Sequence, residues 1–437
     1  MLRIGSVLFA FTMVAPLFGQ ASNLAQEHAE KALQLARKGD LRSAESELRK
    51  ALEISPDDPV LLTSLGGILG MEGELQAANV YLAKAVTINP QDGAARRNLV
   101  ANQWQLGRLK EARQNLDELL RANPRDPIAT YLMGMVAERE ANYERSIALL
   151  ESIPEIAVRQ PEALVALASS YYHTHRSQQA GATLKKLLNG SAKPEVLFMG
   201  GRVAMDAGDY GTAEALAYQA IHTGHAGEPT YLMLCKILSQ RKDYQKAHDI
   251  ASQAVHAFPD SYEALTIKAS MEMKLSYFSQ AAASFESAAR LHPSAEAQRD
   301  LAVAEWRAGE RQKAAIGFER NMRQFPRDGQ TRQTYGALLL EDTSPENKTR
   351  AIELLKQALA VDDSLVEARY QLANIELEDG RLEPALQYLT AALKLDPEAS
   401  RLHFALSRVY RRLGRESDAA KEMEVYQRLK AAEQPHP

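Results

Sequence analysis

The sequence predicts an all-α fold, an α-solenoid built from about twelve helix-turn-helix repeats. The first observation is the stretch 60–90, which has two amphipathic halves separated at Gly73 and ends at Pro90. Its frame of small and apolar residues recurs along almost the whole chain, and self-similarity at a fixed period is typical of stacked repeats. The second observation is composition, because 45% of the 437 residues are hydrophobic but only 6% are aromatic. A core of Ala and Leu suits closely packed helices and argues against an all-β protein.

The repeats follow one another at a nearly constant spacing. Most begin 33 or 34 residues apart, and one spacing is 37 residues. A solenoid grows by adding repeats that contact only their neighbours, so this length does not require several globular domains. The expected repeats begin near Ala25, Pro59, Gly93, Pro127, Pro161, Pro194, Glu228, Tyr262, Ala295, Gly329, Val366 and Ser400.

Two positions of the repeat carry small residues almost throughout. Small side chains at both positions allow two antiparallel helices to approach closely, while larger residues one turn away fill the remaining space. The position near the start of the second helix is occupied by Ala44, Ala78, Ala112, Ser146, Ala180, Ala213, Ala247, Ala281, Ala314, Ala351, Ala385 and Ala419. The position in the first helix is occupied by Ala32, Gly66, Val100, Gly134, Ala168, Gly201, Cys235, Ala269, Ala302, Gly336, Ala373 and Ser407, of which only Val100 is not small.

Glycine and proline mark the turns of the repeat. Glycine adopts the left-handed conformation at the end of a helix at low cost. It is found where the first helix must end, at Gly39, Gly73, Gly107, Gly208, Gly309, Gly380 and Gly414. Proline cannot continue a helix and so separates successive repeats. It closes many of them, at Pro56, Pro90, Pro124, Pro259, Pro293, Pro326 and Pro397.

This 34-residue frame of small, Leu/Tyr, Gly, Ala, Leu/Phe, Ala and Pro positions resembles the tetratricopeptide repeat, over Ala25 to about Leu429. The resemblance implies 24 helices stacked as a right-handed superhelix, with the first helix of each repeat lining a concave face. The fourth to sixth repeats depart most, because the closing proline is displaced or absent around 152–154 and 189–191. In the tenth repeat, 343–347 is expected to form a surface loop.

The N-terminal segment differs from the repeats. Arg3 lies in a short basic start, Ile4 to Phe18 is an almost unbroken apolar run, and small residues surround a cut expected after Ala21. This is the pattern of a secretory signal peptide. The run is shorter than the roughly 20 apolar residues that span a bilayer; an uncleaved membrane anchor is the alternative. We therefore expect an exported protein, periplasmic or secreted, in a bacterial envelope.

The C-terminal end is expected to form a cap. A helix with exposed polar residues should continue to about Lys430, because terminal repeats need a polar outer face. The remaining tail contains two prolines and no apolar anchor, so we expect it to be disordered. The predicted organisation is a signal peptide at 1–21, a solenoid at 22–430 and a disordered tail at 431–437.

Motifs of catalysis or cofactor binding are not found, so we expect no enzyme and no cofactor. The sequence has no His-Glu-x-x-His, Gly-x-Ser-x-Gly or Gly-rich phosphate loop. The pairs His173 with His175, and His222 with His225, are interpreted as solvated side chains near helix ends, and no metal is expected. Cys235 occupies a position that is Gly, Ala or Ser in other repeats, which indicates a small buried residue.

Three carboxylates, Glu272, Glu305 and Glu376, occupy a position that is Leu or Tyr in other repeats. A buried acid with a raised pKa can transfer protons. More often such an acid pairs with a neighbouring Arg or Lys, and this is the interpretation we favour because the three lie at least one repeat apart.

The face lined by the first helices is the best candidate for function. The positions that correspond to the family's concave face carry aromatic and basic residues, which are common in binding interfaces. Some of these side chains are alternatively expected to pack against neighbouring helices. The predicted partner-binding groove comprises Arg97, Trp104, Tyr131, Tyr172, Phe198, Arg202, Lys236, Arg299, Trp306, Tyr370, Asn374, Phe404 and Arg408.

The last repeat is locally basic and offers a second surface. Its arginines are Arg401, Arg408, Arg411, Arg412 and Arg415. They can meet an acidic partner, or they can be balanced by the acids Glu367, Glu376, Glu378 and Glu383 of the preceding repeat. The Lys/Asn clamp by which some family members bind a terminal carboxylate is not supported.

These observations favour a non-catalytic exported scaffold that binds a protein or an extended peptide in its groove. The alternative is a component of envelope polysaccharide synthesis or export, or of envelope assembly, with a glycan as the possible ligand. A formal net charge of −4 argues against nucleic acid as a partner. Membrane contact is expected only through an uncleaved signal segment.

Overall fold

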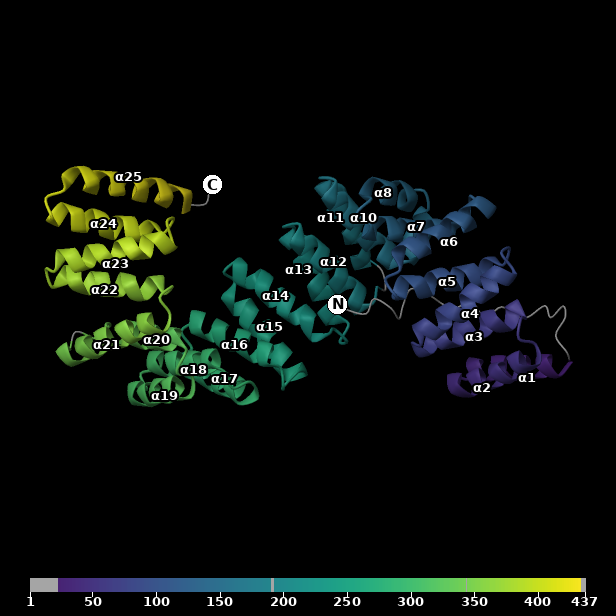
Figure 1. Ribbon diagram of the computed structural model, residues 1–437, viewed down its shortest axis with the longest axis horizontal. Coiled ribbons are helices and arrows are strands. Elements are labelled where there is room, and N and C mark those ends of the chain that lie inside the picture. The colour runs from purple at the N-terminus through teal and green to yellow at the C-terminus, as the bar shows by residue number, and fades with distance from the viewer. Residues whose placement is uncertain (1–22, 190–191, 343, 434–437) are drawn as a thin grey trace. The chain divides into compact units, whose positions relative to one another are not determined.

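The computed structural model describes residues 23–189, 192–342 and 344–433, and within these ranges it contains 25 α-helices, one 3₁₀ helix and no strand. Helices follow one another as hairpins that stack side by side (Figure 1). The predicted all-α solenoid is therefore confirmed. The chain divides into two compact units, Met1–Thr230 and Tyr231–Pro437, which we call the N-terminal and C-terminal units and describe separately. The handedness of a superhelix over the whole chain stays a prediction.

The N-terminal unit contains the first six repeats. Their first helices are α1, α3, α5, α7, α10 and α12. Its elements are α1 (Asn23–Arg37), α2 (Leu41–Ile54), α3 (Pro59–Glu72), α4 (Leu75–Ile88), α5 (Gly93–Gln105), α6 (Leu109–Ala122), α7 (Pro127–Arg139), α8 (Tyr143–Glu151), α9 (Pro154–Arg159), α10 (Pro161–His173), α11 (Ser177–Lys185), η1 (Lys186–Asn189), α12 (Pro194–Asp206) and α13 (Tyr210–His222).

The C-terminal unit contains the other six repeats, and its boundary lies within the helix that opens the seventh. The first helices here are α14, α16, α18, α20, α22 and α24. The elements are α14 (Glu228–Gln240), α15 (Tyr244–Ala257), α16 (Tyr262–Lys274), α17 (Phe278–Leu291), α18 (Ala295–Arg307), α19 (Arg311–Gln324), α20 (Gly329–Leu339), α21 (Pro345–Val361), α22 (Val366–Glu378), α23 (Leu382–Leu395), α24 (Ser400–Arg412) and α25 (Glu416–Glu433). Eleven of the twelve expected repeat starts coincide with the first residue of a helix, and the first helix begins two residues before Ala25.

The expectation of 24 helices is corrected in the fourth repeat. Its second helix, α8, ends at Glu151 after nine residues, and the short α9 follows before the fifth repeat begins. Pro154 is the first residue of α9, because a proline cannot continue the preceding helix but fits the first turn of a new one. In the fifth repeat, α11 likewise ends early and passes into η1.

The expected surface loop at 343–347 is wrong for its last three residues. Pro345 is the first residue of α21, and the Ser344 hydroxyl caps this helix by accepting a hydrogen bond from the Asn347 N–H at 3.1 Å. A serine before a proline is a favourable start for a helix. The three extra residues therefore lengthen the second helix to 17 residues instead of forming a loop.

The two helices of each repeat approach closely, and this explains why small residues recur at two positions of the repeat. All twelve residues at the small position of the second helix are buried, and none is more than 2% exposed. A Cβ atom placed on Gly66 would lie 2.5 Å from the Leu82 Cγ, and one on Gly134 would lie 2.7 Å from the Leu150 Cδ2. These distances are shorter than any real contact, so only glycine fits at these two positions without movement of the leucine.

The turn between the helices uses one conformation in most repeats. The seven predicted turn glycines all have positive φ, between 71° and 88°. Four other repeats place a residue with a side chain in the same conformation, with φ between 58° and 63°. These residues are Ala141, His175, Lys242 and Ser276. The turn is therefore set by the packing of the repeat and does not depend on glycine.

The predicted boundaries at the two ends of the chain can be compared with the described helices. Helix α25 continues to Glu433, three residues past its expected end at Lys430, so the first part of the expected tail is helical. Residues 434–437 and the segment expected to be a signal peptide, 1–21, lie outside the described ranges. In the part of the chain that the structure describes, no helix is long and apolar enough to cross a membrane.

Candidate functional site

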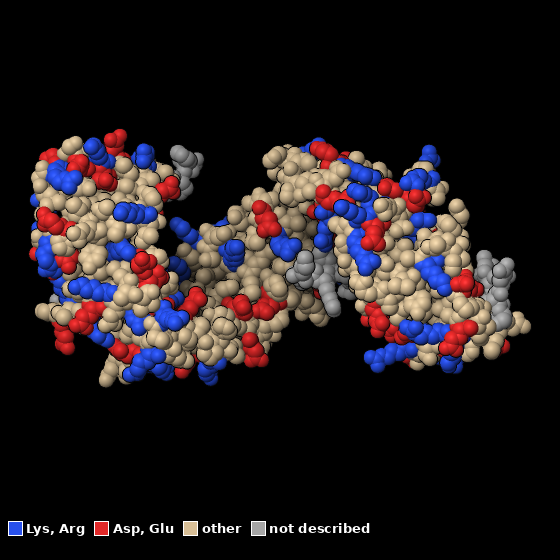
Figure 2. Space-filling view, viewed as in Figure 1, with Lys and Arg blue, Asp and Glu red and all other residues tan. Residues whose placement is uncertain are grey.

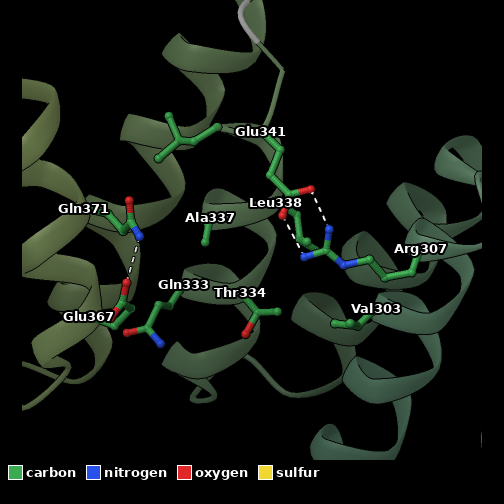
Figure 3. A pocket seen from close by; sticks show the side chains of 10 residues that line it. Val303, Arg307, Gln333, Thr334, Ala337, Leu338, Glu341, Glu367 and Gln371 are labelled. Atoms are coloured by element: carbon green, nitrogen blue, oxygen red, sulfur yellow. Dashed lines mark hydrogen bonds and ion pairs between the residues drawn. The ribbon is translucent and has the colours of Figure 1, made fainter. Parts of the chain in front are cut away.

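The first helices of the C-terminal unit lie side by side, with α18 against α20, α20 against α22, and α22 against α24. This arrangement forms a surface that we call the first-helix groove. A pocket of about 520 Å³ opens in it (Figure 3). It is lined by residues of three consecutive first helices and the turn after α20, namely Val303, Arg307, Gln333, Thr334, Ala337, Leu338, Leu340, Glu341, Glu367 and Gln371.

One wall of the pocket is a paired charge. The Arg307 guanidinium donates two hydrogen bonds to the Glu341 carboxylate, with Nη1 to Oε2 at 2.8 Å and Nη2 to Oε1 at 2.7 Å (Figure 3). Both side chains are about 40% exposed. Such a two-point contact fixes the orientation of the guanidinium plane. The pair therefore joins the ninth and tenth repeats and presents a rigid edge to the groove.

The opposite wall carries a second polar network. The Gln371 Nε2 donates to the Glu367 carboxylate at 2.7 Å, and the Arg401 guanidinium of the last repeat pairs with the same carboxylate at 2.7 Å. Arg401 also lies over the Tyr370 ring, 5.2 Å from its centroid. Glu367 thus holds side chains from α22 and α24 in place.

Gln333 connects the floor of the pocket to the next helix. Its Oε1 accepts a hydrogen bond from the Ala368 N–H at 3.0 Å, which satisfies one of the free amides in the first turn of α22. The residue before α22, Leu365, has no side chain that can do this. Gln333 is therefore a cap supplied by the neighbouring repeat.

The pocket leaves hydrogen-bonding groups for a ligand. Among the described residues, the Gln333 Nε2, the Thr334 Oγ1 and the Gln371 Oε1 make no hydrogen bond. These are one amide donor, one hydroxyl and one amide acceptor, placed beside Val303 and Ala337. Alternating donors and acceptors on an apolar floor can bind the main chain of an extended peptide.

In the N-terminal unit, three predicted groove residues have partners on neighbouring elements. The Arg139 guanidinium of α7 lies over the Trp104 ring of α5, 5.3 Å from its centroid. The Tyr172 hydroxyl donates to the Asp209 carboxylate at 2.9 Å, and burial together with this bond raises the pKa of Tyr172. Arg97 pairs with an aspartate that caps α7, at 3.5 Å. Phe198 is half-buried and Arg202 is exposed.

Two predicted groove residues are wrong. Tyr131 is 3% exposed and Trp306 is 6% exposed, so neither can contact a partner. Helix α7 is buried over nine consecutive residues around Tyr131, and this burial raises the pKa of the Tyr131 hydroxyl. Trp306 contacts the edge of the Tyr335 ring at 6.3 Å between centroids, and the Arg311 guanidinium covers it.

The other predicted residues of the C-terminal unit lie at or near the surface. Arg299 pairs with Asp328 at 3.6 Å, Tyr370 lies under Arg401, and Asn374 is half-buried. Phe404 is 40% exposed. Lys236 and Arg408 are exposed, and neither has an ion pair within the described ranges.

The aromatic and basic residues selected from the sequence do not include most of the pocket. Gln333, Thr334, Ala337 and Gln371 are not among them, because small and amide side chains carry no distinctive interface signal in the sequence. The signal was available in the period, since Gln333 lies 34 residues after Arg299 and 37 before Tyr370, which are the spacings of those repeats.

The three buried acids are paired, as expected. Lys268 Nζ lies 3.0 Å from Glu272 and Lys313 Nζ lies 2.9 Å from Glu305, while Arg381 donates to Glu376. Each of the three residues is at most 8% exposed. These ion pairs explain how acids occupy positions that are apolar in other repeats.

Other candidate chemistry has a structural explanation. His173 stacks on Tyr143, with ring centroids 4.2 Å apart. Cys235 is 1% exposed, and burial raises the pKa of its thiol to about 12, which keeps the thiol protonated. Across 23–189, 192–342 and 344–433, no group of three or more His, Cys, Asp and Glu side chains is arranged to hold a metal ion.

Comparison with known families agrees with this geometry. Two family models, both described as tetratricopeptide repeat, match residues 71–136 and residues 272–328, 346–393 and 370–433. The chain is a multi-repeat protein of the tetratricopeptide repeat family. The matches lie in both units. The tetratricopeptide repeat fold is that of a protein-interaction scaffold.

Several solved structures resemble this tetratricopeptide repeat protein. Yeast Tom70 has 15% identity, covers 93% of this chain and 92% of its own, and has a TM-score of 0.46. A tetratricopeptide repeat protein from Parabacteroides merdae has 18% identity, covers 65% of this chain and 99% of its own, and has a TM-score of 0.36. MamA from Desulfovibrio magneticus has 19% identity over 39% of this chain and 96% of its own, with a TM-score of 0.37. No curated protein matches the sequence.

Proposed function

We propose that this protein is a non-catalytic scaffold that holds an extended peptide segment of a protein partner in the first-helix groove of the C-terminal unit. The supporting observation is the pocket of about 520 Å³ between α18, α20 and α22, with unpaired donors and acceptors beside apolar side chains. Proteins with this repeat are in general non-catalytic scaffolds. Because the surface is preformed, binding orders only the flexible peptide and not the scaffold, which lowers the entropic cost of binding.

A substitution that fills the pocket with a large side chain tests this proposal. Ala337 lies half-buried in the pocket, so we expect Ala337→Phe to fill it and to remove binding of peptides selected from a random display library on the immobilised mature chain. Ala360→Phe is the matched control, because Ala360 is exposed on the second helix of the same repeat. Binding is measured by biolayer interferometry.

Two results would contradict the proposal. One is a selection that enriches no peptide, while an oligosaccharide array gives binding that Ala337→Phe removes. The other is a set of enriched peptides that bind both variants equally, which would move the interaction away from the groove.

We also propose that the protein is exported and that its leader is removed. The support is the basic start, the apolar run from Ile4 to Phe18 and the small residues at Ala21. We expect the mature protein from a bacterial envelope fraction to begin at Ser22, which intact-mass spectrometry measures. A mass that retains the first 21 residues would support an uncleaved anchor instead.

A further inference from the structure

The last first helix, α24, exposes a single stripe of side chains. Five residues of α24 are exposed, namely four arginines and one phenylalanine. The stripe contains no acid. We call it the arginine stripe, and its residues are Arg401, Phe404, Arg408, Arg411 and Arg412.

The two ends of the arginine stripe are held by the eleventh repeat. Arg401 pairs with Glu367 at 2.7 Å and lies over the Tyr370 ring. Arg412 donates a hydrogen bond to the Leu377 carbonyl oxygen near the end of α22. These contacts join the stripe to the helix that forms the wall of the pocket, so the stripe continues the first-helix groove.

The middle of the arginine stripe carries two unpaired cations. Within the described ranges, Arg408 and Arg411 have no ion pair and no hydrogen bond from their guanidinium groups. Of the acids that were expected to balance the stripe, Glu367 pairs with Arg401 at its end, and Glu376 accepts from Arg381, so neither pairs with Arg408 or Arg411. Arg408 and Arg411 are three residues apart on one helix, so they are neighbours about 5–6 Å apart at Cβ and repel each other.

Phe404 gives the arginine stripe an apolar contact. One side of its ring meets Tyr426 of α25, with centroids 5.1 Å apart, while 40% of the residue stays exposed. Phe404 lies one helical turn before Arg408. An exposed aromatic ring beside free guanidinium groups is a common centre of protein interfaces.

We infer that the arginine stripe binds an acidic segment of a partner protein, in which two carboxylates meet Arg408 and Arg411 and an aromatic side chain packs on Phe404. This inference rests on the proposed peptide-binding function of the groove and names the chemistry of the peptide. Charge complementarity carries it, because two guanidinium groups without acids are available to carboxylates.

A short acidic segment fits this surface better than a long polyanion. The neighbouring α22 carries the exposed Glu378, which would repel a polyanion that continued beyond α24. The chain has a net charge of −4, and Lys and Arg are interspersed with Asp and Glu over the visible face of each unit (Figure 2). The positive field is therefore local, about the size of one short peptide.

The direct probe is a labelled peptide with three glutamates around one phenylalanine. Fluorescence anisotropy measures its affinity for the complete mature chain. We expect Arg408→Glu combined with Arg411→Glu to weaken binding at least about tenfold. Arg428→Glu is the control for a change of charge, because Arg428 is exposed on α25 of the same repeat. A peptide with lysine in place of glutamate should recover binding to the doubly reversed variant.

The outcomes separate this inference from the proposed function. Equal weakening by Arg428→Glu and by the reversal of Arg408 and Arg411 would overturn the inference, because it would indicate only the general field. Tighter binding of a single-stranded DNA oligonucleotide or of vesicles with anionic lipid than of the peptide would also overturn it. A third outcome is that Ala337→Phe removes binding of the library peptides while the reversal of Arg408 and Arg411 leaves binding of the acidic probe unchanged. This outcome would contradict the inference and leave the proposed function standing. The failure of both variants to affect any peptide would end both proposals.

Discussion

At the scale of single residues, four side chains occupy the left-handed turn that glycine fills elsewhere. Ala141 has φ of 58° and is exposed, so no contact of its methyl group compensates for the strained backbone. A residue with a Cβ costs about 1–2 kcal/mol in this conformation. The fourth repeat therefore contains a local strain that a single substitution can remove.

We expect Ala141→Gly to stabilise the protein by about 1 kcal/mol, because glycine adopts this conformation without strain. Ala207→Gly is the matched control, since Ala207 is exposed in the equivalent turn of the sixth repeat but has φ of −86°. Urea denaturation followed by circular dichroism measures both variants. Stabilisation by both substitutions, or by neither, would show that the turn is not strained at Ala141.

A second residue-scale prediction concerns Glu47, which is 7% exposed at its side chain. Hydrogen bonds from His28, Lys50 and Lys31 lower its pKa from 4.5 to about 2. A carboxylate whose pKa is lowered by folding adds stability above its unfolded pKa and loses it as the pH falls through the folded value. We expect Glu47→Gln to cost about 1–3 kcal/mol at pH 6.

That cost should decrease as the pH falls from about 4.5 towards 2, because the carboxylate of the unfolded chain binds a proton in this range while the native carboxylate stays charged until about 2. Thermal unfolding at several pH values measures the difference between the two proteins. Glu53→Gln, at an exposed position of the same helix, should have little effect at any pH. A cost for Glu47→Gln that does not change with pH would mean that packing, not charge, is responsible.

The position of a residue in the repeat did not predict its exposure. Trp104 and Trp306 occupy the same position of the repeat, yet Trp104 is half-buried and Trp306 is buried. The difference comes from Tyr335 and Arg311, which close over Trp306. Contacts of this kind depend on neighbouring repeats and are not visible in the period of one repeat.

At the scale of helices, the distance between the two helices of a repeat is set by their small residues. Ala281 is fully buried where α17 faces α16. We expect Ala281→Leu to destabilise the protein by about 1–3 kcal/mol, because the extra atoms have no space. Ala283 is exposed on the same helix, so Ala283→Leu should change the stability by less than about 0.5 kcal/mol.

Differential scanning calorimetry of these two variants checks the helix interface. Equal unfolding temperatures for Ala281→Leu and the parent protein would place the contact between α16 and α17 elsewhere.

The helix starts were predictable because each repeat begins at the same point of the frame. The two exceptions have local causes. Pro154 ends α8 and opens α9, and Ser344 with Pro345 opens α21. The second signal is present in the sequence, since serine before proline is a helix start, and it outweighs the expectation that an insertion forms a loop.

At the scale of the whole molecule, the period predicted the number of repeats but not the division into two units. The boundary at Thr230 and Tyr231 lies inside α14, and no break in the spacing marks it. The period places Gln333 in the same part of the repeat as Arg299 and Tyr370, but it does not show that small and amide side chains of successive repeats leave a pocket there. The proposed groove is therefore formed by variable positions of a regular frame.

The most direct test of the proposed groove is site-specific photo-crosslinking. Benzoylphenylalanine is placed at Ala337 in the first-helix groove, or at Ala360 on the second helix of the same repeat, and each protein is irradiated with a library-selected peptide. Mass spectrometry measures the crosslinked fraction. We expect crosslinking at Ala337 and not at Ala360. Crosslinking at Ala360 alone would contradict the account, because the partner would then bind the face formed by the second helices.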